Sequence, residues 1–226
     1  MADAAGAFVR VIELTKRYAS AAAEVTALDR ITREFAPGIS VALMGSSGCG
    51  KTSLLNLLGG VDRATSGSII VDQLDLGRLD ERALESYRLR KVGYVFQFLN
   101  LIPSLTATEN LELPMLVAGL SKDERRARAQ QLLEFVGLRD KAAKRPEQLS
   151  GGEQQRVAIS LALVNDPPLV LADEPTGNLD SANAAVVTDL LASLAKRGKT
   201  VIVATHDANV AQAFSCVYLM RDGQFI

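Results

Sequence analysis

Short apolar runs alternate along the chain with longer stretches in which apolar residues recur every three or four positions. The short runs are rich in Val and Ile, and several lack a polar face, which is typical of strands buried on both sides of a sheet. The periodic stretches predict helices. The expected strands cover residues 8–14, 39–44, 68–71, 92–96, 169–172, 200–204 and 217–220. The expected helices cover residues 51–58, 81–90, 122–136, 153–164 and 181–195.

This alternation of strands and helices indicates an α/β fold with a mostly parallel sheet. Residues 106–143 interrupt it, because nearly the whole segment has a helical pattern, punctuated by Pro114 and Gly119. We interpret this segment as a helical subdomain inserted between two strands of the sheet. Its charged run, 122–128, is expected to be a solvated helix face, with a partner-binding role as the alternative.

Composition and charge narrow the class of protein. The 226 residues are 48% hydrophobic with a net charge of −1, so the chain can bury a substantial core and lacks the basic surplus typical of nucleic-acid binding. No run of about 18 apolar residues predicts a membrane-spanning helix, and residues 1–6 lack the features of a secretory signal. Cys49 and Cys216 have no metal-ligand spacing. These features predict a cytosolic protein with reduced thiols.

Residues 45–52 read Gly-Ser-Ser-Gly-Cys-Gly-Lys-Thr and lie between an expected strand and an expected helix. This is the spacing and the context of a phosphate-binding loop. Glycines let successive N–H groups point at one anion, and the positive end of the following helix adds to the attraction. Lys51 is expected to contact the β- and γ-phosphates, and Thr52 the Mg²⁺ that accompanies them. The residues expected to bind nucleotide here are Gly45, Ser46, Ser47, Gly48, Cys49, Gly50, Lys51, Thr52 and Ser53.

Two carboxylates, Asp173 and Glu174, follow the apolar run 169–172. A buried strand tolerates carboxylates only at its exposed end, where a cation or a water can meet them. We expect Asp173 to hold Mg²⁺ through water, and Glu174 to accept a proton from the water that attacks the γ-phosphate. The alternative is that both carboxylates only cap the following turn, 175–177.

Residues 149–156 read Leu-Ser-Gly-Gly-Glu-Gln-Gln-Arg. Ser150 and Glu153 have the spacing of a capping box, which begins a helix. A cap does not require two consecutive glycines, which reduce helix stability. Gly151 and Gly152 therefore favour the close approach of a large anion to the positive end of the helix. Together with Ser150 they are expected to grip a γ-phosphate.

Combined with the phosphate-binding loop, residues 149–156 resemble the signature sequence of the ATP-binding-cassette (ABC) nucleotide-binding domains, and the resemblance covers residues 8–226. It implies a P-loop NTPase core with a mostly parallel sheet, a small antiparallel β subdomain and an inserted helical subdomain. The implied organisation is a single domain, 1–226. Residues 1–97 and 165–226 would form the nucleotide-binding core, and residues 98–164 the helical subdomain.

The resemblance also implies roles for single residues outside these motifs. Tyr18 resembles the aromatic residue that stacks on adenine, and Gln97 the glutamine that senses the γ-phosphate and Mg²⁺ and connects to the membrane partner. His206 resembles the switch histidine at the γ-phosphate, and Asp180, in the loop 178–180, a residue at the dimer interface. The implied catalytic residues are Glu174, His206, Lys51 and Gln97. The implied Mg²⁺-binding residues are Thr52, Gln97 and Asp173, with ATP as the nucleotide.

Ordinary structural alternatives exist for several of these side chains. Tyr18 would pack at a sheet edge, Gln97 would be a polar group at a strand end, and His206 would cap a helix. His206, the only histidine, follows an expected strand at its carboxyl end, where ligands bind in open α/β sheets. Cys49 is expected to serve as a small side chain within the loop, with a reactive thiol as the alternative.

In the ABC family, two copies pair head to tail in the ATP state, and each ATP lies between the phosphate loop of one copy and the signature sequence of the other. The resemblance therefore implies a homodimer with two equivalent sites, each closed by residues 150–152 of the facing copy. ATP would hold the pair together, and hydrolysis at Glu174 would release it.

Residues 98–115 and 173–180 resemble the subclass that serves macrolide exporters, lipoprotein-release systems and related bacterial complexes. Its members act with a separate integral membrane permease, which implies a peripheral ATPase at the cytoplasmic face of the membrane. Membrane contact would come through the permease only, with no nucleic-acid partner. Apolar residues beside Gln97 would help to form the permease groove: Leu99, Leu101, Ile102 and Leu105. The alternatives are packing of these residues within the helical subdomain, a soluble ABC ATPase in cofactor assembly, and an adenylate-kinase-like transferase, which the signature sequence disfavours.

Overall fold

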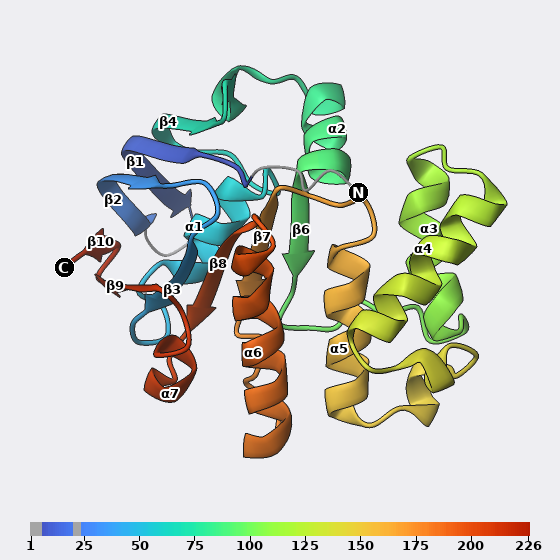
Figure 1. Ribbon diagram of the computed structural model, residues 1–226. Helices are drawn as coiled ribbons and strands as arrows, with labels where there is room; N and C mark the ends of the chain where they lie inside the picture. The colour runs from blue at the N-terminus through green and yellow to red at the C-terminus, as the bar shows by residue number, and fades with distance from the viewer. Residues whose placement is uncertain (1–5, 20–23) are drawn as a thin grey trace.

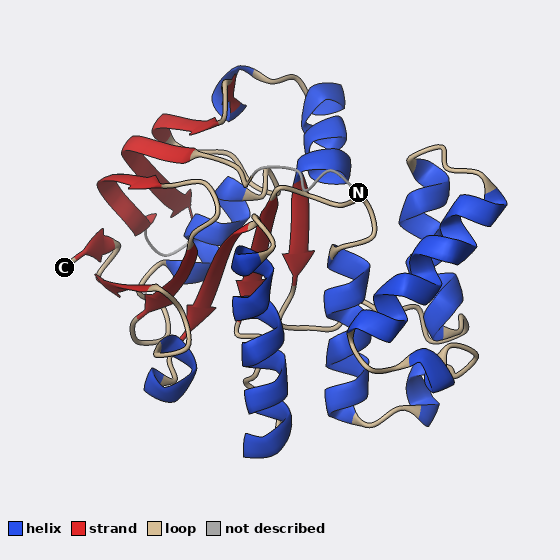
Figure 2. Cartoon of the chain, in the orientation of Figure 1, coloured by secondary structure: helices blue, strands red, loops and turns tan. Residues whose placement is uncertain are grey.

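The computed structural model describes residues 6–19 and 24–226, and its larger sheet lies at the centre of the molecule (Figures 1 and 2). The strand order is β10–β9–β3–β8–β7–β6. Neighbouring strands from β9 to β6 pair in parallel, whereas β10 pairs antiparallel with β9. The strand bounds are β3 Ser40–Met44, β6 Val92–Val95, β7 Leu169–Asp173, β8 Thr200–Thr205, β9 Cys216–Arg221 and β10 Gln224–Phe225. The predicted mostly parallel sheet is confirmed.

A smaller antiparallel sheet has the order β2–β1–β4–β5. Its strands are β1 Val9–Ala19, β2 Glu24–Phe35, β4 Ser66–Val71 and β5 Leu74–Asp75. This is the expected antiparallel subdomain, but the predicted first strand ended at residue 14, and neither β2 nor the two-residue β5 was predicted. Charged residues are spread along β2, and register shifts in β1 after Val11, Leu14 and Lys16 break the alternation of apolar residues. Residues 1–5, where a secretory signal was sought, lie outside the described residues.

The helices agree with the predicted ones, except that α3 was expected only as part of the helical segment 106–143 and α7 was not expected. Their bounds are α1 Lys51–Leu58, α2 Glu81–Lys91, α3 Ala107–Val117, α4 Lys122–Phe135, α5 Gly151–Ala162, α6 Ser181–Lys196 and α7 Ala208–Ala211, with short 3₁₀ turns at Leu76–Arg78, Arg139–Lys141 and Pro146–Gln148. Pro114 lies inside α3 and does not interrupt it, while Gly119, with a φ of 88°, follows its end. The helix α7 was not predicted, since four residues are too short to show a period.

Two apolar clusters pack on opposite faces of the larger sheet. Side chains alternate along each strand, so Val201 and Val203 of β8 join the cluster formed with α3, α4, α5 and α6. Ile202 and Ala204 join the cluster formed with α1 and the small sheet. The helices α3 and α4 pack on α5, which itself contacts β6 (Figure 1). This packing leaves the carboxyl ends of β3, β7 and β8 together at one edge.

None of the helices in residues 6–19 and 24–226 combines the length and the apolar character needed to span a bilayer.

Candidate functional site

The phosphate-binding loop joins the end of β3 to the start of α1 and is curled around the ammonium group of Lys51. Gly50 caps α1 with a φ of 107°, a conformation that favours glycine, and a Cβ there would overlap the carbonyl of Ala27. The Nζ of Lys51 donates to the carbonyl oxygens of Gly45 at 2.7 Å and Ser46 at 3.1 Å. Lys51 is only 6% exposed, so a positive charge is held at the base of the loop.

Asp173, at the end of β7, connects to the loop through Thr52. Its Oδ1 accepts a hydrogen bond from Thr52 Oγ1 at 3.1 Å, which brings two of the expected Mg²⁺-binding residues together. Burial raises the pKa of the Asp173 carboxyl, the nearby Glu174 carboxylate adds to the rise, and Thr52 and Lys51 oppose it. A bound cation would stabilise such a carboxylate. The described side chains contain no cluster of three metal-ligating His, Cys, Asp or Glu residues, so a cation here would share its ligands with phosphate oxygens and water.

Glu174 follows in a backbone conformation with a φ of 45°, which is unusual for a residue other than glycine. Its N–H donates to the carbonyl of Ala204 at 3.0 Å, and its carbonyl accepts from the N–H of Gly177 at 3.1 Å. Its Oε2 lies 2.9 Å from His206 Nδ1, and its Oε1 lies 3.8 Å from Lys51 Nζ. The carboxylate therefore lies between the loop lysine and the histidine.

A cavity of about 320 Å³ collects most of the residues expected at the phosphates. Its lining consists of Ser47, Gly48, Gly50, Lys51, Thr52, Ser53, Gln97, Glu174, Gly177, Asn178 and His206. Gly177 was not predicted to line it, and Asn178 was assigned to the dimer interface. Cys49 is 3% exposed within the loop, as a small packed side chain would be. The arrangement can hold a polyphosphate at a lysine and a helix start, with a carboxylate placed to take a proton from water.

Ser150, Gly151, Gly152 and Asp180 form a second group, at the N-termini of α5 and α6. The described residues that line the polar cavity do not include any of the four. The N–H of Ser150 donates to Glu153 Oε2 at 2.8 Å, and the N–H of Glu153 donates to Ser150 Oγ at 3.3 Å, so the predicted capping box is present.

The two glycines of this group have different surroundings. A Cβ at Gly152 would overlap the side chain of Asn183, whose N–H and Nδ2 both donate to the carboxylate of Asp180 at 2.8 Å. Packing within this chain therefore favours glycine at position 152, which was not predicted from the sequence. A Cβ at Gly151 would meet nothing nearer than Leu179 Cδ2 at 4.0 Å, so the space in front of Gly151 is open.

Tyr18 lies near the end of β1 and is 39% exposed. Its hydroxyl donates to Asp62 Oδ2 at 2.9 Å, and the Nζ of Lys16 lies 4.7 Å from the centre of its ring. Neither of these partners was predicted from the sequence. The register shift after Lys16 removes the simple alternation that would relate Lys16 to Tyr18 along the strand, and Asp62 lies 44 positions away.

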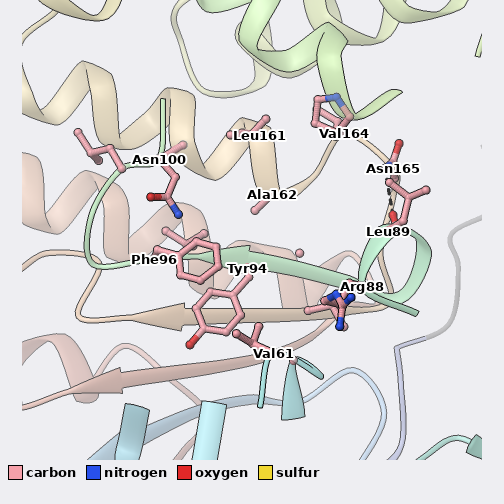
Figure 3. A pocket seen from close by; sticks show the side chains of 17 residues that line it. Val61, Arg88, Leu89, Tyr94, Phe96, Asn100, Leu161, Ala162, Val164 and Asn165 are labelled. Carbon is pink, nitrogen blue, oxygen red and sulfur yellow. Dashed lines mark hydrogen bonds between the residues drawn. The ribbon is translucent and has the colours of Figure 1, made fainter. Parts of the chain in front are cut away.

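A second, mainly apolar cavity of about 260 Å³ lies where β6 meets α5 and the ends of α2 and α3 (Figure 3). The rings of Tyr94 and Phe96 stack at a centroid distance of 4.1 Å at its wall. Phe96 lines this cavity and the next residue, Gln97, lines the polar one, so the segment after β6 reaches both. Of the four apolar residues expected in a permease groove, Leu99 lines the cavity, whereas Leu101 packs on the helical core.

Sequence and structure comparisons agree on the kind of protein that this chain resembles. A model of the ABC transporter family, described as "ABC transporter", matches residues 28–177. The lipoprotein-releasing system ATP-binding protein LolD of Syntrophotalea carbinolica is 43% identical over 219 residues, covering 96% of each chain. The macrolide export ATP-binding/permease protein MacB of Rhodopseudomonas palustris is 43% identical over 97% of this chain and 34% of its own length. The dimeric post-hydrolysis structure of the ATP-binding cassette MJ0796 bound to ADP and Pi has a TM-score of 0.89 at 41% identity, covering 96% of each chain.

Proposed function

The chain belongs to the ABC transporter family as an ATP-binding subunit with ATPase activity, and we propose that it drives a separate membrane permease of an export-type complex. The observation that carries this proposal is the segment after β6, in which Phe96 lines an apolar cavity and Gln97 lines the polar one. MgATP would occupy the polar cavity and the permease the apolar one. A movement of this short segment would then change both cavities.

Within the polar cavity, the residues divide into those that hold the polyphosphate and those that act on water. The backbone N–H groups of residues 45–53 and the ammonium of Lys51 bind the β- and γ-phosphates. Thr52 and Gln97, which line the cavity, and Asp173, which bonds to Thr52, would hold Mg²⁺, and this ion would neutralise charge that develops on the phosphate oxygens. Glu174 takes a proton from water as the water oxygen attacks the γ-phosphorus and the bond to the ADP oxygen breaks. His206 orients the Glu174 carboxylate and contacts the γ-phosphate.

A second copy of the chain would complete each site. In a head-to-tail pair with two-fold symmetry, Ser150, Gly151 and Gly152 of one copy reach the γ-phosphate bound to the other, and Asp180 lies at the same interface. The open space at Gly151, at the positive end of α5, supports this arrangement, as does the dimeric state of the related cassette MJ0796. We take residues 1–226 as a single ABC ATPase domain, with residues 98–164 as its helical subdomain and 1–97 and 165–226 as its nucleotide-binding core.

The permease partner is supported by exposed apolar residues in the same segments of the chain as residues that line the apolar cavity. Phe98 is 77% exposed next to Gln97, and Leu116 and Val117 of α3 are 54% and 69% exposed. If these side chains form one patch, it would be suited to a protein partner, because contiguous exposed apolar surface is typical of such sites. One relative is named as a subunit of a lipoprotein-releasing system, and another combines an ATP-binding part and a permease in one protein. The chain would thus act at the cytoplasmic face, with the membrane reached through the permease only and without a nucleic-acid partner.

The test uses Glu174→Gln, which should bind ATP and scarcely hydrolyse it. This variant is expressed in the native host and purified with MgATP from solubilised membranes, and its companions are identified by mass spectrometry. A stoichiometric multi-spanning permease is expected, and the added change Leu99→Asp, in the apolar cavity, should remove it. Recovery of both forms from the soluble fraction with soluble partners would contradict the proposal and favour a role in cofactor assembly.

A further inference from the structure

We propose that Lys16 and Asp62 are positioning residues that fix the ring of Tyr18 and thereby set the affinity for the adenosine part of the nucleotide. This inference rests on the proposed function, because it takes Tyr18 as the platform on which the base stacks. The three residues come from two parts of the chain, β1 and the loop that follows α1.

The carboxylate of Asp62 joins the other two side chains. Its Oδ1 accepts from Lys16 Nζ at 2.7 Å and from the N–H of Arg63 at 2.7 Å, while its Oδ2 accepts from the Tyr18 hydroxyl at 2.9 Å. Lys16 Nζ also donates to the carbonyl of Arg63 at 2.8 Å. Burial would raise the pKa of Asp62, but the hydrogen bonds from Lys16, Arg63 and Tyr18 lower it overall, so the carboxylate is ionised near neutral pH.

Tyr18 is thereby constrained at two places. Asp62 holds its hydroxyl, and the Lys16 ammonium lies against the ring, 4.7 Å from its centre, in a cation–π arrangement. Lys16 itself is 9% exposed, whereas Tyr18 is 39% exposed, so part of the ring remains free to contact a base. A ring that is already oriented loses less conformational entropy when a ligand stacks on it.

The Asp62 loop is also attached to the helix that carries the phosphate-binding residues. The N–H groups of Val61 and Asp62 donate to the carbonyl of Asn56, in α1, at 2.9 and 3.2 Å. Burial raises the pKa of Tyr18, and Ser53, in the first turn of α1, opposes that rise by hydrogen bonding to it. Asp62 therefore ties the small sheet to α1, and it holds the base platform at a set position relative to the phosphate loop.

The experiment compares two ligands that share a diphosphate, MgADP and magnesium pyrophosphate, by isothermal titration calorimetry. Neither ligand can be hydrolysed at the γ-phosphate. Asp62→Ala and Lys16→Met should weaken MgADP about tenfold, within the range for loss of one base–aromatic stack, and should change pyrophosphate less than about twofold. Asp62→Asn keeps an acceptor for Tyr18 and should lose less than Asp62→Ala. Glu34→Gln, which removes the 2.6 Å ion pair with Arg10 in the same small sheet, serves as the matched control and should change neither.

The outcomes separate this inference from the proposed function. Equal losses for both ligands would mean that Lys16 and Asp62 only support the fold, and would overturn the inference. So would unchanged MgADP binding in Asp62→Ala and Lys16→Met when Tyr18→Ala binds MgADP weakly. If Tyr18→Ala itself binds MgADP normally, the base platform is wrong and the inference falls with it, while the ATPase proposal stands on the phosphate loop. If Asp62→Ala does not fold, as judged by circular dichroism, Asp62→Asn and Lys16→Met decide.

Discussion

The two groups of predicted site residues differ in how they are assembled. In the phosphate-loop group, contacts join distant parts of the chain: Thr52 bonds to Asp173 across 121 positions, and Glu174 to His206 across 32. In the signature group, the polar contacts are local, from Ser150 to Glu153 and from Asp180 to Asn183. Long-range polar contacts build the first group. Local helix caps build the second, and the packing of α5 on α6 brings these caps together.

This difference has a functional consequence. The polar side chains of the first group surround a cavity that a nucleotide can enter in one copy of the chain. The capping bonds of the second group leave the space in front of Gly151 open, at a helix end that attracts anions. Changes in the first group should therefore affect nucleotide binding by a single chain. Changes in the second group should leave that binding unchanged and affect the step that needs two copies.

Of the changes proposed here, Gly151→Arg, in the second group, should have the largest effect on ATP hydrolysis. The added side chain has room in the isolated chain but would fill the space that a facing copy needs. Phosphate release should fall about a hundredfold, the scale of a lost transition-state contact, while the Kd for MgADP stays within about twofold. Light scattering of the Glu174→Gln protein with MgATP should show a dimer that Gly151→Arg abolishes. A parallel loss of MgADP affinity would contradict the separation of the two groups.

Gly151→Ala and Gly152→Ala should differ in stability, because only Gly152 is packed against another side chain. Gly152→Ala should lower the free energy of unfolding by about 2 kcal/mol, because the new Cβ overlaps Asn183. Gly151→Ala has space and should leave stability equal or slightly higher, because alanine favours the helix. Urea denaturation gives both values.

Asn183→Ala in the Gly152→Ala chain is the matched rescue. It removes the overlapping Oδ1 and Cγ of Asn183 and leaves its Cβ, which would lie 3.0 Å from the new methyl group. Part of the lost stability should therefore return. Equal stability of the two glycine variants without this change would show that Asn183 moves aside freely.

Local patterns predicted most of the strands and helices and the chemistry of the phosphate loop, because each depends on a few adjacent residues. The phosphate loop is read from eight positions, and the buried strands from their apolar runs. The strand β2 escaped prediction, because its charged residues hide the pattern of a half-buried strand. The order in which the strands pair follows from contacts between segments far apart, which no local pattern contains.

The candidate site divides in the same way. The residue types at positions 173 and 174 indicated a cation and a water, but not the 2.9 Å contact between Glu174 and His206. Gly152 was attributed to an anion, although the neighbouring helix also requires it. The partners of Tyr18 were missed, since Asp62 approaches it only in the folded chain.

Asp173→Asn tests the first group through the pH dependence of the free energy of unfolding. Burial raises the pKa of Asp173, so the folded chain binds this proton more tightly than the unfolded chain, and the ionised carboxylate reduces stability above the folded pKa. Without Mg²⁺, Asp173→Asn should add about 1 kcal/mol to the free energy of unfolding at pH 7. The gain should shrink as the pH falls through the raised pKa and disappear below the usual value of 3.8.

Asp180→Asn, in the signature group, is the control for the Asp173→Asn experiment. Hydrogen bonds from Asn183 lower the pKa of Asp180, so its ionised form stabilises the folded chain above its usual pKa. The asparagine should therefore be slightly less stable than the aspartate at pH 7, with the difference lost on acidification. Chemical denaturation from pH 3 to pH 8 in EDTA measures both. If both substitutions changed the free energy of unfolding at pH 7 in the same direction, the assignment of Asp173 as a buried carboxylate suited to a cation would be contradicted.

Glycine and alanine at position 174 test the left-handed backbone conformation of Glu174, in which the carboxylate lies between Lys51 and His206. Alanine at a φ of 45° should cost about 1 kcal/mol relative to glycine, so Glu174→Gly should be the more stable variant. At Glu153, inside α5, the order should reverse by about 0.5–1 kcal/mol, because glycine weakens a helix. Thermal denaturation of the four variants compares them. The same order at both positions would mean that residue 174 leaves the left-handed region once its side chain is gone, so that the carboxylate's contacts, rather than the bonds to Ala204 and Gly177, hold the turn.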